Sequence, residues 1–204
     1  MPANGRCPHL VFRDVLGPAT AAALLEYAVA CEAHFRVARA YDRRSGEVAF
    51  DPSRRDCVLH AGLGPFQARM ESFVRSVVAP ALDELHVNEP GGEPKELEVS
   101  AYGDGGHFNA HIDTVEVLDR VRILSCVYYF AATPPRFSGG ALRLHAFPGK
   151  TGADSDAPPY VDVAPETDTF VVFPSWLRHE VLPVRVPSGA WADRRFAINC
   201  WIHR

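Results

Sequence analysis

Two segments in the first half of the chain carry apolar residues at helical spacing. The first runs from about residue 18 to residue 37, behind a turn-like Leu-Gly-Pro sequence, and its apolar positions are Ala22, Leu25, Ala28 and Val29. The second runs from about residue 65 to residue 85, with apolar positions Phe66, Met70, Phe73, Val74 and Val77. Both patterns predict amphipathic helices whose apolar faces pack on the core. Pro80 should kink or divide the second helix, because proline lacks the amide hydrogen that a helix interior needs.

Short apolar runs separated by turn residues fill the second half of the chain, and this pattern indicates strands. The runs cover residues 98–102, 107–112, 121–131, 141–146, 161–163, 169–173, 179–186 and 195–203. About eight such strands suit a double-sheet jelly roll. Residues 88–95, which contain two Gly and two Pro, are typical of a connection from the helical part into the sheets. Residues 147–160, rich in Pro and Asp, are interpreted as an insertion at the rim of the barrel.

A charged segment from residue 38 to residue 57 lies between the two predicted helices. It is rich in Arg, Asp, Ser and Gly, which predicts a surface loop or hairpin. The interpretation we favour is that its arginines are solvated, namely Arg43, Arg44, Arg54 and Arg55. A substrate-contact role is the alternative, since loops carry specificity more often than scaffold strands do.

Composition narrows the class of protein. With 204 residues, 47% of them hydrophobic, the chain can bury one sizeable core, and its net charge of −4 gives no reason to expect a nucleic-acid partner. The five cysteines stand singly without a Cys-x-x-Cys pair, which argues against a thiolate zinc site and a disulfide framework and favours a reducing cytoplasm. We expect no signal peptide, membrane anchor or transmembrane helix, and the sequence leaves the oligomeric state unknown.

His111 and Asp113 stand two residues apart in a predicted strand, and His179 begins a later one. Side chains at i and i+2 of a strand point to the same face, so the first two can reach one ion while His179 completes a triangle. Two His and one carboxylate with open positions are the ligands of non-haem Fe(II) oxygenases. A His-x-Asp pair followed by a His also arises by chance in a chain with nine His, so the neighbouring residues have to decide.

Those neighbours form an ordered series. Tyr102 and a Gly-rich turn lead into the His111 strand, and further motifs follow: Arg122-Ile-Leu-Ser-Cys-Val-Tyr-Tyr-Phe130, Gly139-Gly140-Ala-Leu-Arg-Leu144, Phe170-Val-Val-Phe-Pro174, Arg178-His-Glu-Val-Leu-Pro-Val184 and Arg195-Phe-Ala-Ile-Asn-Cys-Trp201. This series resembles the catalytic domain of the prolyl 4-hydroxylase-like dioxygenases, which depend on 2-oxoglutarate and iron. The resemblance extends from about Glu98 to Ile202, roughly half of the chain.

The resemblance implies roles for individual residues. His111, Asp113 and His179 match the iron ligands, and Arg195 matches the residue that binds the distal carboxylate of 2-oxoglutarate, with Tyr129 and Tyr102 beside it. The segment before Arg195 is longer than is usual in the family, so Arg194 is a competing anchor. Strand alternation favours Arg195, because it shares a face with Trp201.

Two further residues are expected to contact the substrate. Alternation places His107 on the same side of its strand as His111, where it faces the substrate or orients a metal ligand. Trp201, in the closing strand, is the second expected contact.

The resemblance also implies an architecture and a reaction. We expect an α+β, mainly β fold: a double-stranded β-helix of the jelly-roll or cupin-like type, with the N-terminal helices packed on its major sheet. Residues 1–204 would form a single catalytic domain, in which 1–95 supply helical support and a substrate loop and 96–204 form the core. The expected cofactors are Fe(2+), 2-oxoglutarate and O2, with ascorbate as an accessory reductant. The expected chemistry is hydroxylation of an unactivated C–H bond with release of succinate and CO2.

Two questions stay open at this level. The substrate is either a prolyl or other residue of a peptide or protein, or a free amino acid or small natural product, because fold and motif determine the reaction type only. The alternative function is a cupin-like protein that binds a metal without oxidation. Arg195 distinguishes the two, since a structural metal site closes its coordination with a fourth protein ligand and needs no keto-acid anchor.

Overall fold

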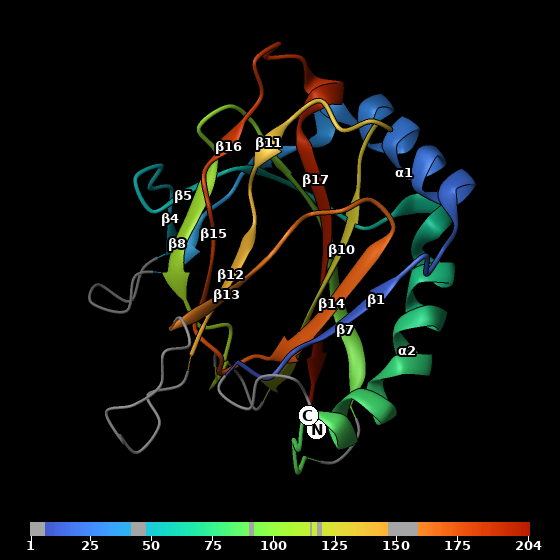
Figure 1. Cartoon of the computed structure of the whole chain (residues 1–204), viewed down its shortest axis with the longest axis vertical. Coiled ribbons are helices and arrows are strands. Elements are labelled where there is room, and N and C mark those ends of the chain that lie inside the picture. Colours follow the sequence, from blue (N-terminus) through green and yellow to red (C-terminus); the bar gives the residue numbers. More distant parts are fainter. Residues whose placement is uncertain (1–6, 42–47, 90–91, 115, 118–119, 147–158) are drawn as a thin grey trace.

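A large antiparallel sheet forms the centre of the molecule. The structure is a computed structural model that describes residues 7–41, 48–89, 92–114, 116–117, 120–146 and 159–204. Within these residues the large sheet has the order β1-β14-β10-β17-β7-β6-β2, and β9 pairs with β10 (Figure 1). Its strands are β1 (Leu10–Arg13), β2 (Arg36–Val37), β6 (Val58–Ala61), β7 (Glu93–Tyr102), β9 (Glu116–Val117), β10 (Arg120–Phe130), β14 (Thr169–Pro174) and β17 (Arg195–His203).

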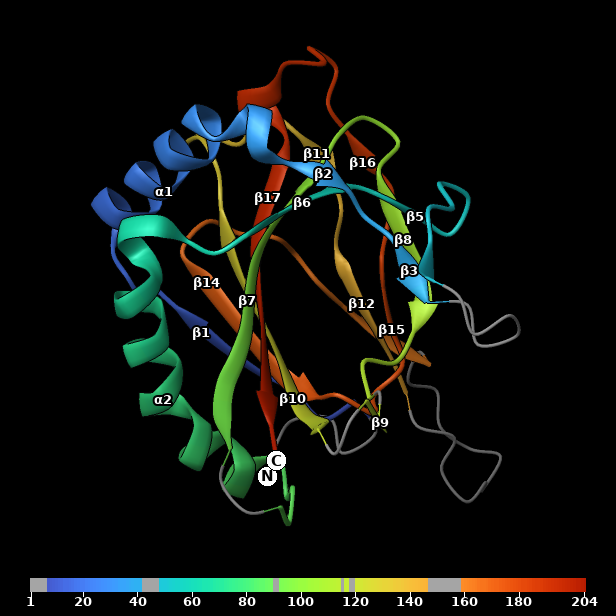
Figure 2. The same cartoon turned by 180° about the vertical axis from the view of Figure 1, so that it is seen from behind.

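A smaller antiparallel sheet faces the large one, in the order β13-β12-β15-β8-β5. Its strands are β5 (Arg55–Asp56), β8 (His107–His111), β12 (Leu142–His145), β13 (Tyr160–Val163) and β15 (His179–Val181). Two short pairs complete the described strands: β3 (Ala40–Tyr41) with β4 (Val48–Ala49), and β11 (Ser138–Gly139) with β16 (Val184–Arg185). Figures 1 and 2 show this sheet on one side of the large sheet and the helices on the other.

Two helices, α1 (Pro18–Ala30) and α2 (Gln67–Glu84), cover the outer face of the large sheet (Figure 2). Single turns of 3-10 helix lie at Glu32–His34, Gly64–Phe66 and Trp191–Asp193. Leu24 of α1 and Val74 of α2 belong to the same buried cluster as Phe196 and Ile198 of β17. Apolar burial between helices and sheet is therefore what holds this layer in place. Neither helix of the described chain is long and apolar enough to cross a membrane.

A buried carboxylate joins the start of α1 to the large sheet. Asp168 accepts hydrogen bonds from the amides of Leu16 and Gly17, each at 2.8 Å, and from the hydroxyl of Tyr128 at 2.9 Å. Gly17 precedes the helix and has no side chain with which to cap it. Asp168 satisfies amide groups just before this helix start, a task otherwise left to a capping residue.

The expected mainly β jelly roll is confirmed, and all eight predicted strands are present. The seventh is divided into β15 and β16, because Leu182 and Pro183 interrupt it, and β7 begins at Glu93, before the predicted start. Strands β1, β2, β5, β6, β9 and β11 were not predicted. The segment 38–57 contains the hairpin β3–β4 as expected, but Arg43 and Arg44 lie outside the described residues, as does most of the predicted insertion at 147–160.

The face and the end expected for the first helix were wrong, and of the two effects expected of Pro80 the division of the second helix does not occur. The buried face of α1 consists of Thr20, Ala21, Leu24 and Ala28, whereas Ala22 and Val29 are exposed and the helix ends at Ala30. So many small alanines leave the apolar stripe poorly defined in the sequence. Pro80 does not divide α2, which is one helix from Gln67 to Glu84, and it lies on the exposed side, where water can satisfy the freed carbonyl.

Bulges in β8 and β10 interrupt the alternation of side chains. Between the pairs His179–His111 and Val181–Phe108, β8 contains one residue more than β15. A second irregularity lies between Arg122 and Leu124 of β10. A bulge shifts the alternation by one residue, so side chains three apart point to the same side.

Candidate functional site

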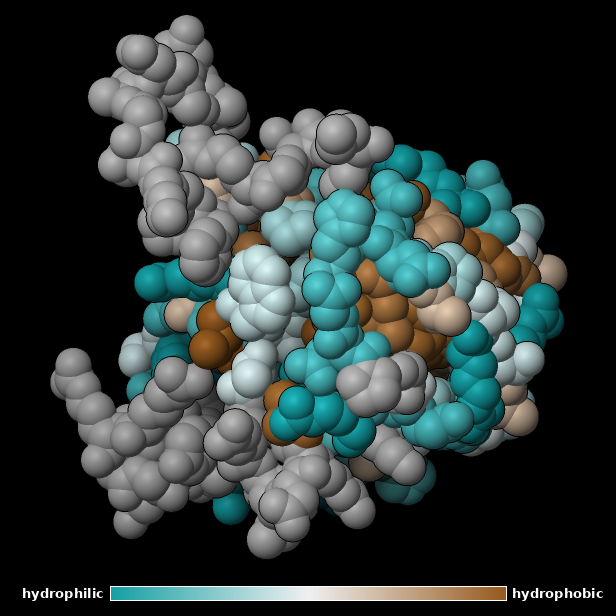
Figure 3. All heavy atoms as spheres, turned by 90° about the horizontal axis from the view of Figure 1, so that it is seen from below, coloured by the Kyte–Doolittle hydropathy of each residue, from teal (hydrophilic) through white to brown (hydrophobic). Residues whose placement is uncertain are grey.

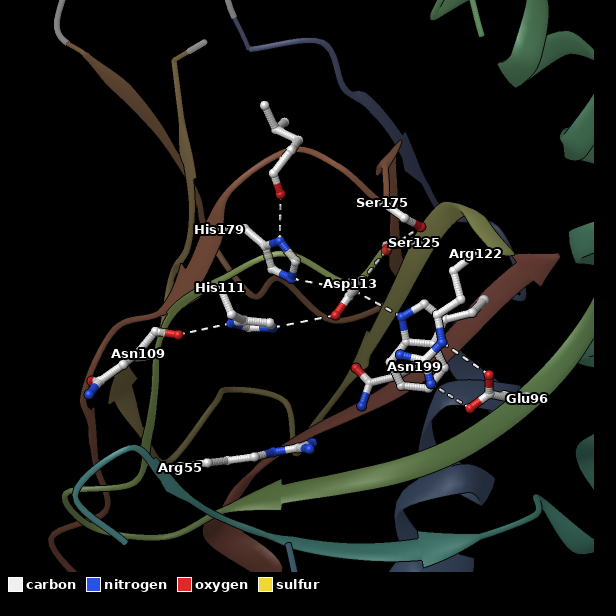
Figure 4. A network of polar contacts seen from close by, with 12 residues as sticks. Arg55, Glu96, Asn109, His111, Asp113, Arg122, Ser125, Ser175, His179 and Asn199 are labelled. Atoms are coloured by element: carbon white, nitrogen blue, oxygen red, sulfur yellow. Dashed lines mark hydrogen bonds and ion pairs between the residues drawn. The ribbon is translucent and has the colours of Figure 1, made fainter. Parts of the chain in front are cut away.

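His111, Asp113 and His179 come together in the space between the two sheets. His111 ends β8, His179 begins β15, and the two are direct cross-strand partners. Asp113 follows two residues after His111, and its amide donates to the carbonyl of Ser175 at 2.9 Å. The structure thus places the three predicted ligands side by side, and their ligating atoms all lie within 4.8 Å of one another (Figure 4).

Hydrogen bonds orient both imidazoles. Nδ1 of His111 donates to the carbonyl of Asn109 and Nδ1 of His179 to that of Leu177, each at 2.8 Å. This tautomer, assigned from the hydrogen bonds, leaves both Nε2 atoms as free lone pairs directed at Asp113. Each Nε2 lies 3.4 Å from one carboxylate oxygen of Asp113. Donors about 2.1 Å from one ion lie about 3 Å apart when adjacent, so the three atoms suit one face of an octahedral ion.

Two side chains donate hydrogen bonds to the Asp113 carboxylate. Ser125 Oγ donates to Oδ2 at 2.7 Å, the indole Nε1 of Trp201 donates to the same oxygen at 2.8 Å, and Ser125 also contacts Ser175 at 3.0 Å. Such neighbours hold a metal ligand in its orientation. Neither serine was predicted as part of the site, because a polar residue beside an apolar run is a weak signal. Trp201, expected to contact substrate, lines the cavity but is committed to Asp113.

Electrostatics keeps the carboxylate charged. Burial alone would raise the pKa of Asp113. The adjacent imidazoles of His179 and His111 outweigh burial and hold this pKa well below its usual range. Burial and the neighbouring His179 lower the pKa of His111, which favours its neutral, metal-binding form. Burial also acts to lower the pKa of His179. The neighbouring Asp113 carboxylate outweighs burial, so the pKa of His179 is raised.

Arg195 lies deep in the same cavity and is 1% exposed. Its guanidinium carbon lies 5.0 Å from the ring centre of Tyr102 and 4.9 Å from that of Tyr129, and its Nε donates to the carbonyl of Gly140 at 2.7 Å. Gly140 is required here: its φ is +67°, and a Cβ would lie 2.5 Å from Arg195 Cδ. We call Arg195, Tyr102 and Tyr129 the anchor pocket.

The anchor pocket has the polar groups of an anion site. No carboxylate of the described residues forms an ion pair with Arg195, although a buried guanidinium normally requires an anionic partner. The hydroxyl of Tyr129 is buried without a hydrogen-bond partner in the same described part of the chain. A carboxylate bound here would satisfy both groups, and the residues present therefore fit a dicarboxylic cosubstrate that also reaches the metal.

The competing anchor, Arg194, lies elsewhere. Its guanidinium stacks on the ring of Trp191 at 4.6 Å, and it does not line the cavity. Alternation along β17 places Arg195, Asn199 and Trp201 on the cavity side, whereas Phe196 belongs to the core under the helices.

His107 does not lie where simple alternation puts it. The bulge in β8 turns Phe108 toward the cavity, where its ring stacks on His111 with centroids 3.6 Å apart. His107 is not among the residues that line the cavity, and its ring contacts the carbonyls of Gly105 and Ser53. The assumption of unbroken alternation in this strand was therefore wrong, and nothing in this position favours a substrate contact.

A cluster of charged side chains, not predicted as a site, lines the same cavity. Arg122 holds Glu96 with two N–H groups and lies 4.0 Å above the ring of Trp201. Arg55 of β5, for which solvation was the favoured expectation, extends into the cavity opposite His111, Asp113 and His179 (Figure 4). Glu98 of β7 lies beside it. The whole cavity measures about 1000 Å³. Hydrophilic and hydrophobic residues lie side by side on the face of the molecule that Figure 3 shows.

Comparison with known proteins agrees with this geometry. The model of the 2OG-Fe(II) oxygenase superfamily matches residues 97–203. An uncharacterized PKHD-type hydroxylase of Synechocystis is 35% identical over 109 residues, which are 53% of this chain and 36% of that protein. The match thus spans little more than a third of that relative's length.

Solved structures share the fold. A prolyl-4-hydroxylase of Pseudomonas putida superposes with a TM-score of 0.64 at 20% identity, over 97% of this chain and 93% of the other. A Trichoplax adhaerens prolyl hydroxylase, in complex with a peptide fragment of the hypoxia inducible factor oxygen degradation domain, gives 0.65 at 18% identity, over 96% and 83%. The family match covers just over half of the residues and includes the three converging ligands and Arg195. The chain therefore belongs to the 2OG-Fe(II) oxygenase superfamily.

Proposed function

We propose that the protein is an Fe(II)- and 2-oxoglutarate-dependent dioxygenase that hydroxylates an unactivated C–H bond. One observation carries the proposal: a buried guanidinium without a carboxylate partner among the described residues shares a cavity with a His-Asp-His triad. Bound iron would supply the activation of O2, with one oxygen atom entering the product and the other entering succinate as 2-oxoglutarate loses CO2. Ascorbate is the accessory reductant that we propose.

The residues of the chain then have separate tasks. His111, Asp113 and His179 hold the metal from one side and leave the opposite positions free for cosubstrate and O2. Arg195 and Tyr129 bind the distal carboxylate of 2-oxoglutarate, and the ring of Tyr102 packs beside the guanidinium. Ser125 and Trp201 keep the Asp113 carboxylate in place. Phe173 and Leu142 contribute apolar walls that keep water away.

The alternative of a metal-binding protein without oxidation fits less well. Among the described residues the cluster contains three ligands and no fourth His, Cys, Asp or Glu, whereas structural metal sites are closed by four. In such a protein the buried guanidinium of Arg195 would also have no anionic ligand to bind.

The substrate is proposed at the level of class: a prolyl or other peptidyl residue, or an amino-acid-like small molecule. We further propose that residues 1–204 act as one catalytic domain, with 1–95 in a supporting role. The five cysteines are all free thiols, which supports the proposed cytoplasmic setting.

The test is the turnover of 2-oxoglutarate by protein purified without oxygen and then given Fe(II). Succinate release is expected from the native chain even without a primary substrate, at a slow rate. His111→Ala should abolish Fe(II) binding and succinate release together, because two ligands cannot hold the ion in a facial site. Arg13→Gln, on an exposed ion pair with Glu166, is the control. Equal turnover by native protein and His111→Ala would refute the assignment.

A further inference from the structure

Two partly buried groups of opposite charge in the cavity have incomplete partners. The Arg55 side chain is 12% exposed, and its Nε is buried without a hydrogen-bond partner in the described part of the chain. Its Nη2 lies 3.7 Å from Glu98 Oε1, which is too long for a hydrogen bond. Glu98 accepts one long bond, from Asn199 Nδ2 at 3.4 Å. We call Arg55, Glu98 and Asn199 the charged corner.

Glu96, a second carboxylate on β7, has more and shorter hydrogen bonds than Glu98. Glu96 accepts two N–H bonds from Arg122 and lies 2.7 Å from Nε2 of His203. Arg122 and His203 line the cavity as Arg55 does. Glu98 therefore has fewer and longer hydrogen bonds than Glu96, although both carboxylates lie on β7 and line the same cavity.

Burial makes this incompleteness costly. The Glu98 side chain is 24% exposed, and its partial burial raises its pKa against the pull of Arg55. A guanidinium and a carboxylate in such a place need short hydrogen bonds to offset their lost hydration. A ligand that offers an anion to Arg55 and a cation to Glu98 would supply them. In an α-amino acid, the ammonium and the carboxylate are attached to the same carbon, which matches two receiving groups 3.7 Å apart.

The charged corner also lies at the right place for catalysis. The Arg55 guanidinium is stacked over the ring of Phe108 at 4.6 Å, and that ring is stacked on the metal ligand His111 at 3.6 Å. A molecule held by Arg55 is thus one aromatic ring away from the metal ligands. Figure 4 shows the Arg55 side chain extended across the cavity floor, with the triad above it and Asn199 beyond its tip.

We propose that the primary substrate is a free α-amino acid, whose carboxylate binds Arg55 and whose ammonium group binds Glu98 with Asn199 beside it; this rests on the dioxygenase function proposed above. Its side chain points toward the triad, and one of its C–H bonds becomes C–OH. The hydroxyl oxygen comes from O2, the second oxygen atom enters succinate, and 2-oxoglutarate releases CO2. No further oxidant or reductant is needed for this balance.

A residue inside a peptide fits the charged corner less well. Its nitrogen and carbonyl are parts of neutral amides, so the pairing of Arg55 and Glu98 would stay incomplete in the complex. A site built to bind polar groups rejects ligands that lack them, because its buried groups are then left without partners.

The test measures succinate release by the Fe(II)-loaded full chain with 2-oxoglutarate and O2. Each of the twenty free L-amino acids is added singly, followed by its N-acetyl and C-amide derivatives and by a proline-containing peptide. At least one free amino acid should stimulate release above the substrate-free rate, and it should yield a product heavier by one oxygen. Blocking either charged group of that amino acid should raise its KM about tenfold or more.

Variants then connect the effect to the charged corner. Glu98→Gln and Arg55→Met should each raise the KM for the amino acid about tenfold or more, and Glu98→Gln should lose most of the discrimination against the N-acetyl derivative. Glu93→Gln on the same strand and Arg75→Met, which together form an exposed ion pair, are the matched controls and should behave as native.

The outcomes separate this inference from the function on which it rests. Substrate-free succinate release without stimulation by any amino acid would overturn the inference and leave the dioxygenase function standing. Stimulation by the peptide or by blocked derivatives as strong as that by the free amino acid would overturn it too. Absence of any iron-dependent succinate release would overturn both the inferred substrate and the dioxygenase function.

Discussion

The anchor pocket and the charged corner each contain a buried guanidinium, yet their surroundings differ. Arg195 has aromatic rings on two sides and no carboxylate of the described residues in contact. Arg55 has Glu98 at 3.7 Å and an aromatic ring on one side. The anchor pocket can therefore bind a negatively charged group. The charged corner can bind a ligand that carries a negative and a positive group. The identity of the neighbours, more than the arginine itself, indicates which ligand each region can hold.

The largest expected effect is at the anchor pocket. Arg195→Met removes the charge that binds the distal carboxylate, so we expect the KM for 2-oxoglutarate to rise about a hundredfold or more. Arg194→Met is the matched control on the neighbouring residue, which stacks on Trp191 outside the cavity. Steady-state succinate release at varied 2-oxoglutarate measures both. If Arg194→Met had the larger effect, the roles of the two arginines would have to be exchanged.

A smaller effect is expected on the metal affinity of the His-Asp-His triad. Trp201→Phe keeps the ring under Arg122 but removes the N–H that holds Asp113. We expect Fe(II) affinity to fall about tenfold, in the range usual for a lost neighbour of a metal ligand. Titration with Fe(II) or Mn(II) under anaerobic conditions measures it, and Trp176→Phe, an exposed tryptophan, is the control. Unchanged metal affinity would mean that Trp201 acts on the substrate instead.

The smallest expected effect is a difference in pH dependence between substrate binding at the charged corner and 2-oxoglutarate binding at the anchor pocket. Burial raises the pKa of Glu98, so its charged form is lost at a higher pH than is usual for a glutamate as the solution is acidified. Binding that needs the carboxylate is fully present above this pKa and is lost below it, so the KM for the amino acid should rise severalfold as the solution is acidified through this pKa. In the anchor pocket, burial raises the pKa of Tyr129, which stays neutral during this acidification. The KM for 2-oxoglutarate at saturating metal should therefore change less, and equal pH profiles would contradict the distinction.

Much of the fold was predictable from the sequence because its signals are local. The apolar runs gave all eight core strands, and alternation along β17 gave the cavity-facing side with Arg195 and Trp201. Short edge strands such as β5 and β2 were missed, since two residues carry no periodic pattern. The exposed side of α1 was misassigned for a related reason: alanine is compatible with both burial and exposure.

The site was predictable where chemistry requires particular residue types. The His-x-Asp pair and the arginine of the closing strand are distinctive in type and spacing, and the structure brings them into one cavity. Ser125 and Glu98 were not predictable, because their roles depend on which strands lie beside them. Arg55 resembled a solvated residue of a charged loop until its strand was seen to pair with β8. Contacts between distant segments have no signature in a local pattern.

The bulge in β8 has a consequence for how this wall could be altered by insertion or deletion. Phe108 and His111 share the cavity side because of one extra residue between them. Removing that residue would leave the composition of the strand almost unchanged but would exchange its two faces, so that Phe108 would turn outward and its neighbour inward. In this strand a change of length by one residue would therefore redraw the binding surface more thoroughly than most substitutions, and variation in strand length is a route by which related enzymes could acquire different substrates on one unchanged metal centre.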